Sequence, residues 1–120
     1  MEYVLLIYGE ESKWSNLPPT DQQALYEEYF ALSRDLTAQA KLKSSNELHS
    51  VTSATTIAVR DGETIVSDGP FAETKEVLGG YFVIEAETLD EAIDWAARIP
   101  TAKTGRIEIR PAVDHSGGGS

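Results

Sequence analysis

The spacing of apolar residues predicts several strands in this chain. The runs at 3–8 (YVLLIY) and 81–86 (YFVIEA) are apolar on both faces of an extended backbone, apart from Glu85. Strands of this kind are usually covered on both sides. A last strand is expected at 106–110, with Ile107 and Ile109 inward and charged residues outward. The intervening segment 43–53 is polar, with a candidate short edge strand at 47–49.

Helical spacing predicts two helices. The first is expected to begin at Thr20, which has the spacing of a capping box with Gln23, and to fade near Ala40. Residues 9–20 before it are predicted to form a loop. The second follows a capping box of Thr88 and Glu91 and is stopped by Pro100. Its expected buried stripe is Leu89, Ala92, Trp95, Ala96 and Ile99.

A hairpin is predicted between the two halves of the chain. Its arms are 55–59 and 64–67, and the Asp61-Gly62 pair between β-branched runs is a strong turn signal. The resulting order is βαββαβ with an added β-hairpin. It predicts one ferredoxin-like α+β domain with an antiparallel sheet over residues 1–113, followed by a flexible tail at 114–120.

The two helices are enough to cover only one face of this sheet. The strands at 3–8 and 81–86 are nevertheless apolar on both faces. An exposed apolar face of that size is unusual for a monomer. We therefore expect it to pack on the same face of a second copy, in a homodimer with two-fold symmetry.

Composition narrows the classes of partner. The chain has 120 residues and a formal net charge of −10, which argues against nucleic acid and anionic membrane surfaces as partners. It contains no cysteine, which excludes thiol chemistry and suits a reducing compartment. The N-terminus lacks the basic region of a signal peptide, so a cytoplasmic location is expected. No metal site is predicted, because one candidate histidine with scattered carboxylates is weak evidence for one. No cofactor is predicted, and the sequence lacks the G-x-G-x-x-G and P-loop motifs of nucleotide binding.

One segment resembles a known family. The stretch 68–76 (DGPFAETKE), followed by 79–82 (GGYF), is similar to the signature of the YCII-related family, specifically its DGPF branch. Further similarity lies in the opening strand with Trp14, in Thr55-Thr56 and in the second helix up to Pro100. The resemblance implies a dimeric α+β barrel of ferredoxin-like protomers. It also implies that the chain could accompany an extracytoplasmic-function sigma factor, as many members of the branch do.

The resemblance implies little chemistry. Better-known relatives in the wider family carry a His–Asp pair proposed as an acid/base site, with the His on the first helix. This chain has no histidine between Thr20 and Ala40, so that role does not transfer to the first helix.

Asp68 is the leading candidate for a catalytic residue, as a general base or as an acceptor for a substrate donor. His49 is the candidate to pair with it across the sheet, since histidine commonly serves as a general acid or base. The alternative is structural: Asp68 accepts N–H groups of its own turn, and Phe71 fills the core.

Five further residues are candidates for ligand binding. Phe71 and Trp14 are expected as pocket walls, and Glu73, Lys75 and Glu76 as polar contacts, with Lys75 binding an anionic group. The alternative is a solvated charged loop, in which ion pairs contribute about 0–1 kcal/mol each.

The expected function is small-ligand binding or weak catalysis by a dimeric α+β barrel. The alternative is a non-enzymatic protein-interaction or regulatory module.

Overall fold

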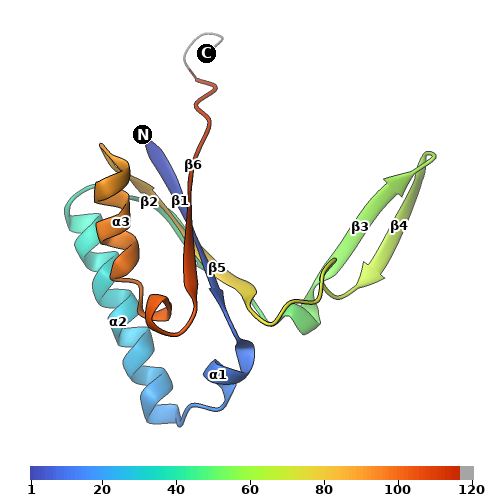
Figure 1. Cartoon of the computed structure of the whole chain (residues 1–120), viewed down its shortest axis with the longest axis horizontal. Coiled ribbons are helices and arrows are strands. Elements are labelled where there is room, and N and C mark those ends of the chain that lie inside the picture. The colour runs from blue at the N-terminus through green and yellow to red at the C-terminus, as the bar shows by residue number, and fades with distance from the viewer. Residues whose placement is uncertain (117–120) are drawn as a thin grey trace.

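The computed structural model describes residues 1–116, and Figure 1 shows their arrangement. The first half contains β1 (Glu2–Gly9), α1 (Glu11–Ser15), α2 (Pro19–Ala38), β2 (Leu42–Glu47) and the short 3₁₀ helix η1 (Val51–Ser53). The second half contains β3 (Thr55–Arg60), β4 (Glu63–Asp68), β5 (Val77–Glu85), α3 (Leu89–Ala97), the 3₁₀ helix η2 (Pro100–Lys103) and β6 (Arg106–Pro111).

The sheet confirms the ferredoxin-like prediction. Its strand order is β2-β5-β1-β6, and every neighbouring pair is antiparallel. The central strand β1 pairs with β5 from Glu2↔Glu85 onward and with β6 from Tyr3↔Pro111 onward. The added hairpin, β3 with β4, forms a separate two-stranded sheet.

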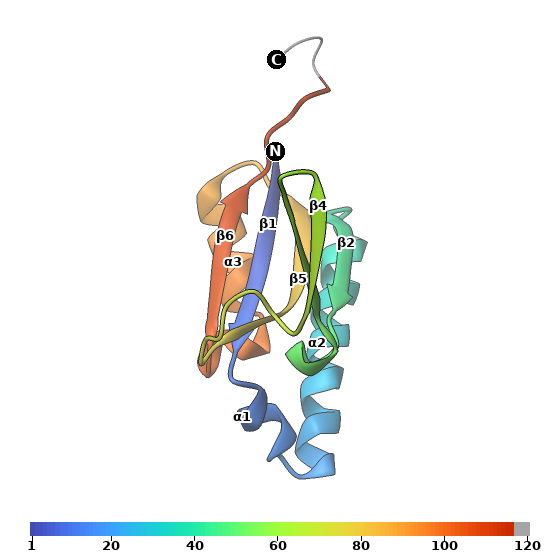
Figure 2. The same ribbon diagram turned by 90° about the vertical axis from the view of Figure 1, so that its right-hand side faces the viewer.

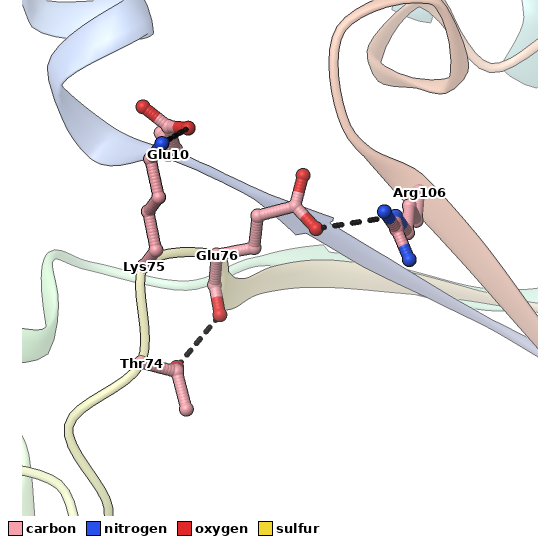
Figure 3. A pocket seen from close by; sticks show the side chains of 5 residues that line it. All are labelled: Glu10, Thr74, Lys75, Glu76 and Arg106. Atoms are coloured by element: carbon pink, nitrogen blue, oxygen red, sulfur yellow. Dashed lines mark hydrogen bonds and ion pairs between the residues drawn. The ribbon is translucent and has the colours of Figure 1, made fainter.

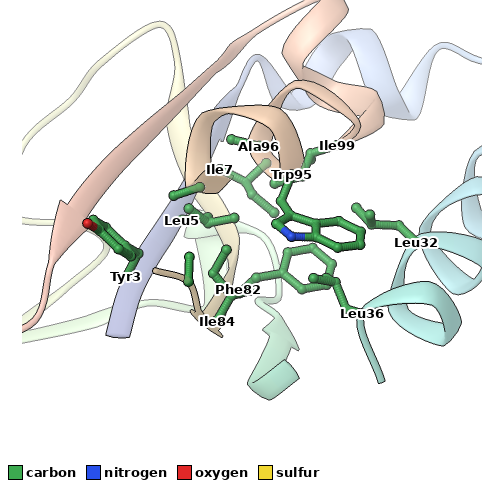
Figure 4. Close-up of a cluster of buried hydrophobic side chains, with 12 residues drawn as sticks. Tyr3, Leu5, Ile7, Leu32, Leu36, Phe82, Ile84, Trp95, Ala96 and Ile99 are labelled. Atoms are coloured by element: carbon green, nitrogen blue, oxygen red, sulfur yellow. The ribbon is translucent and has the colours of Figure 1, made fainter. Parts of the chain in front are cut away.

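The core lies between the sheet and the two long helices, which cover the same face (Figure 4). Alternation along β1 and β5 sends every second side chain into it, as the two-residue period of a strand requires. The twelve buried members are Tyr3, Leu5, Ile7, Leu32, Leu36, Phe82, Ile84, Ala86, Ala92, Trp95, Ala96 and Ile99. Trp95 and its helical neighbours are buried as predicted, but Leu89 at the start of α3 is exposed, so its place in the buried stripe was wrong.

The start of α3 is built around Glu91. The backbone N–H of Glu91 donates to the Thr88 hydroxyl at 3.1 Å, as the predicted cap requires. In return the Glu91 carboxylate accepts the backbone N–H of Glu87 at 3.0 Å and the Trp95 indole N–H at 3.4 Å. Lys41 Nζ lies 3.1 Å from the same carboxylate. The hydrogen bond from Glu87 and then the contact with Lys41 lower the pKa of Glu91 below its ordinary 4.5.

Two predictions before α2 were wrong. The segment 9–20 is not all loop, because Glu11–Ser15 forms α1. The helix α2 begins at Pro19 rather than at Thr20, with Pro18 as N-cap and no side-chain capping bond, so the capping box with Gln23 is not formed. Proline has the φ of a first helical residue and needs no N–H there, which explains the earlier start.

Two strands also differ from their predicted bounds. The edge strand precedes the predicted 47–49 and runs over Leu42–Glu47, where only Leu42 is apolar. The position of β2 is therefore set by its pairing with β5 and not by a hydrophobic pattern in its own sequence. β5 begins at Val77, before the predicted residue 81. Of the predicted tail at 114–120, residues 117–120 lie outside the described part of the chain.

The sheet has one open face. Val4 and Leu6 on β1 and Tyr81 and Val83 on β5 point away from the helices and are half-buried. Polar side chains flank them on the edge strands, such as Glu108 opposite Leu6. The β3–β4 hairpin stands on this side of the sheet, and Figure 2, viewed from that side, shows it in front of the other strands. Among the described residues, no helix combines the length and the hydrophobicity that crossing a membrane requires.

Replacing Glu91 by Gln is expected to destabilise the protein near neutral pH and progressively less in acid. The pKa of Glu91 is lowered in the folded state, so its carboxylate stabilises the fold above about pH 4.5, and this contribution is lost as pH falls through the lowered pKa. Urea denaturation at several pH values measures the difference. Glu87→Gln removes a charge from the same helix end and is the control. If the unfolding free energies of wild type and Glu91→Gln differ by the same amount down to strongly acidic pH, the stabilising role of the Glu91 carboxylate is contradicted.

Gly80→Ala is expected to destabilise the protein by about 1–3 kcal/mol, because the added methyl group must displace the edge strand. A Cβ at Gly80 would lie 2.8 Å from the backbone oxygen of Asn46 on β2. The adjacent Gly79 is the matched control, since its Cβ would meet only the Ile7 carbonyl oxygen at 4.0 Å. Equal unfolding free energies for the two variants would show that β2 does not pack as closely as described.

Candidate functional site

Three strand ends meet at one corner of the open sheet face. Antiparallel pairing places the end of β1 beside the start of β5 through Gly9↔Val77, and beside the start of β6 through Tyr8↔Arg106. Glu10 directly follows β1, and residues 74–76 directly precede β5. Charged side chains from three distant parts of the chain therefore converge there.

These side chains line a hollow of about 490 Å³ (Figure 3). Its lining residues are Glu10, Thr74, Lys75, Glu76 and Arg106. The volume is within the range of pockets for small molecules, which is about 300–1,000 Å³. The hollow is open and every residue that lines it is polar or charged, so it would suit a small charged ligand better than an apolar one.

Two ion pairs organise the hollow. Lys75 Nζ lies 3.5 Å from Glu10 Oε1, and Arg106 Nε lies 3.5 Å from Glu76 Oε1. The hydroxyl of Thr74 donates to the backbone oxygen of Glu76 at 2.7 Å, which holds the turn before β5. Strong charge-assisted hydrogen bonds are about 2.7–2.9 Å long, so both ion pairs are loose.

The two cations of the hollow remain accessible to solvent. The Arg106 side chain is 84% exposed and that of Lys75 is 83% exposed. Within residues 1–116, neither terminal nitrogen of the Arg106 guanidinium makes a hydrogen bond. Such a guanidinium has its paired donors free, and this is the geometry that binds a carboxylate or a phosphate with two hydrogen bonds.

A second hollow of about 440 Å³ adjoins the first and shares Glu76 and Arg106 with it. Its other lining residues are Tyr8, Ile107 and Glu108. Tyr8 and Glu108 alternate with the core-facing residues of their strands and so belong to the open sheet face. The polar corner is therefore continuous with the face that the helices leave uncovered.

Of the seven residues singled out from the sequence, Lys75 and Glu76 line the first hollow. Glu73 lies two residues before Lys75 in the same loop and is exposed, with no hydrogen bond or ion pair among the described residues. The structure thus brings Lys75 and Glu76 together with Glu10, Thr74 and Arg106, which the sequence did not mark as site residues.

Asp68 and His49 occupy other positions. Asp68 is the last residue of β4, opposite Thr55, and is exposed. His49 is exposed in the connection between β2 and η1. Within residues 1–116, neither side chain makes a hydrogen bond or an ion pair, so their pairing and the alternative role of Asp68 as a turn acceptor are both unsupported by contacts. Their catalytic role stays a prediction.

The aromatic candidates also separate. Phe71 is 90% exposed, which excludes the alternative that it fills the core. Trp14 lies on α1 and is half-buried, with its ring edge-to-face against Tyr26 at 5.0 Å between centroids. The Gln22 side chain donates to the Trp14 backbone oxygen at 3.0 Å. Trp14 therefore anchors α1 on α2, and it does not line either hollow.

Glu10, Thr74 and Arg106 were missed as members of one site. Thr74 stands in the charged stretch around Lys75, but Glu10 and Arg106 carry no local signal. Strand order was the available clue: in a ferredoxin-like sheet the last strand lies antiparallel beside the first, so the residue that ends one neighbours the residue that begins the other.

No metal site is evident in the described part of the chain, where no three His, Cys, Asp or Glu side chains are grouped so that they could hold an ion. In the hollow, each of the two carboxylates already faces a cation. The arrangement can bind, orient and neutralise charged groups of a ligand.

Comparison with known proteins agrees with the fold. The pattern of the YCII-related domain matches residues 1–116. An uncharacterized protein of Rhizobium meliloti (strain 1021) is 39% identical over 113 residues, which cover 92% of this chain and 91% of that protein. The match extends over the three α-helices, the whole four-stranded sheet and the loop that lines the hollow, and the chain therefore belongs to the YCII-related domain family.

Proposed function

We propose that this protein binds a small polar ligand in the hollow at the corner of the open sheet face, and that it does so as a homodimer. The observation that carries the proposal is the convergence of two cations and two carboxylates from three chain segments on one cavity of about 490 Å³. Loose and accessible ion pairs are readily exchanged for contacts with a ligand, at small cost in folding free energy.

The chemistry of the lining suggests the class of ligand. Arg106 and Lys75 would bind a carboxylate or phosphate group, while Glu10 and Glu76 would accept hydrogen bonds from its amine or hydroxyl groups. The lining offers no nucleophile with an adjacent base, so it supports binding more directly than catalysis. We also propose a cytoplasmic location, which the absence of cysteine supports. Membership of the DGPF branch is proposed as well, and the DGPF sequence at 68–71 supports it.

The homodimer is supported by the pattern of the open face. Its centre on β1 and β5 is apolar, and its edges on β2 and β6 are polar. Protein interfaces commonly have an apolar centre and a polar rim. A second copy laid on this face would also lie against the hollow that Tyr8 and Glu108 border, so the ligand site would be at the seam between copies.

A protein-interaction module is the second candidate. The observation that favours it is the β3–β4 hairpin, which exposes large apolar side chains beyond the body of the domain. A regulatory companion of another protein would need such a surface and would not need the polar hollow.

Arg106→Gln and Lys75→Gln are each expected to weaken binding of a small carboxylate or phosphate ligand at least tenfold, because each removes one cation from the hollow. A thermal-shift screen of metabolites that carry these groups finds the ligand, and titration calorimetry measures the loss. Arg110→Gln is the matched control, since Arg110 lies on the same strand and the same sheet face but does not line the hollow.

The same screen has outcomes that count against the proposal. If no compound stabilises the wild type, the ligand-binding proposal fails. Equal binding by Arg106→Gln and wild type would place the site elsewhere, and Asp68→Asn in the same assay shows whether the sequence-based candidate is that place.

Leu6→Arg is expected to convert the dimer to a monomer, because it puts a charge at the centre of the open face, between Tyr81 and Glu108. Size-exclusion chromatography with light scattering measures the mass at micromolar concentration. Leu89→Arg is the control, since Leu89 is an exposed apolar residue on the helical side. A monomeric wild type would refute the homodimer.

A further inference from the structure

The β3–β4 hairpin, hereafter the arm (residues 55–68), stands off the body of the domain. It pairs only with itself in the sheet arrangement, and it leaves the four-stranded sheet at an angle (Figure 1). The radius of gyration is 16.7 Å, whereas about 13.6 Å is expected for a compact domain of this length. The arm and the C-terminal residues 112–116 extend beyond the body and account for the excess.

The arm is attached to the body through its base. There the backbone N–H of Gly69 donates to the Ala54 oxygen at 2.7 Å, and the Thr56 hydroxyl donates to the Gly69 oxygen at 2.7 Å. These bonds hold the two ends of the arm together, and among the described residues its two strands pair only with each other. A two-stranded hairpin by itself is at best marginally stable in water.

Both faces of the arm carry apolar side chains. Ile57 and Val66 are opposite each other in the register, and they are 64% and 62% exposed. Val59 lies on the same face, and Ile65 opposite Ala58 lies on the other; both large residues are exposed. An edge strand that must remain free in solution usually carries charges or proline at such positions. This arm therefore has the composition of a covered element.

The same chain has a second uncovered apolar surface, the open sheet face, on the side from which the arm projects (Figure 2). Two copies related by a two-fold axis can cover both surfaces at once, because each copy offers an arm and receives one. A different protein would have to match two separate surfaces on this chain. A second copy is thus the single occupant that can cover both the open sheet face and one face of the arm.

Interface area supports the same occupant. Four strands spaced about 4.8 Å apart and about seven residues long give an open face of roughly 450 Å². This is below the roughly 800 Å² per partner that stable interfaces commonly bury. One face of the arm, two strands of six residues, adds about 200 Å². Contact through the arm therefore brings the interface close to the usual size.

We propose that the arm is exchanged between copies: it packs against the body of the second protomer and clamps the dimer formed by the open sheet faces. This inference rests on the homodimer proposed above. It adds a defined contact, made by Ile57, Val66 and their apolar neighbours, that the sheet-to-sheet dimer does not itself require.

The first test measures the dimer dissociation constant by analytical ultracentrifugation. The double variant Ile57→Asp with Val66→Asp is expected to raise the constant at least tenfold, because it places two carboxylates in the proposed contact. The double variant Ile57→Val with Val66→Ile keeps the arm apolar and is expected to match the wild type within twofold. An unchanged constant for the aspartate variant, together with a monomeric Leu6→Arg, would refute the exchanged arm and leave the dimer standing. A monomeric wild type would refute both.

A second measurement covers the case in which the aspartate variant fails to fold. The chain has no cysteine, so a single Val66→Cys can be followed by its reaction with a thiol reagent such as dithiobis(nitrobenzoate). We expect this thiol to react at least tenfold more slowly in the dimer than in the Leu6→Arg background. Glu28→Cys, exposed on α2, is the control and should react equally in both. Equal rates for Val66→Cys would show that the arm is free in solution and would refute the proposal.

Discussion

The structure depends on an imbalance between the sheet and its helices. The central strands β1 and β5 are apolar on both faces, and within the described residues α2 and α3 cover them on one side. Burial of that side forms the core around Leu5, Ile84 and Trp95. The other side is left half-buried, and every surface with an inferred role either lies on it or projects from it.

The polar corner follows from the same arrangement. Because neighbouring strands are antiparallel, the end of β1 and the starts of β5 and β6 lie at one edge, and the chain turns there with charged residues. A charged cluster at the margin of an apolar face is accessible in one copy and would be partly enclosed between two. Enclosure would lower the local dielectric constant and strengthen the contacts of Arg106 with an anionic ligand. Ligand affinity and dimer formation would then be coupled.

The sequence predicted those parts of the fold that have a local signal. β1, β5, the Asp61-Gly62 turn and the cap of α3 at Thr88 were recognisable because hydrophobic period or turn chemistry decides them. The edge strand β2 was misplaced because its residues are polar and its position is set by pairing with β5. Of the site, only Lys75 and Glu76 were predictable, since Glu10 and Arg106 become their neighbours through strand order.

The net charge of −10 sets a condition on the proposed dimer. Two such copies repel each other at long range, although physiological salt screens charges beyond about 8 Å. Short-range burial of apolar surface must therefore outweigh the repulsion, at about 25 cal/mol per Å² removed from water. The open face alone provides a modest area. The arm enlarges the apolar area of the interface through the uncharged residues 57, 59, 65 and 66. The additional apolar area would help two acidic copies to associate against their charge repulsion, and this would explain why the chain has an exposed apolar arm.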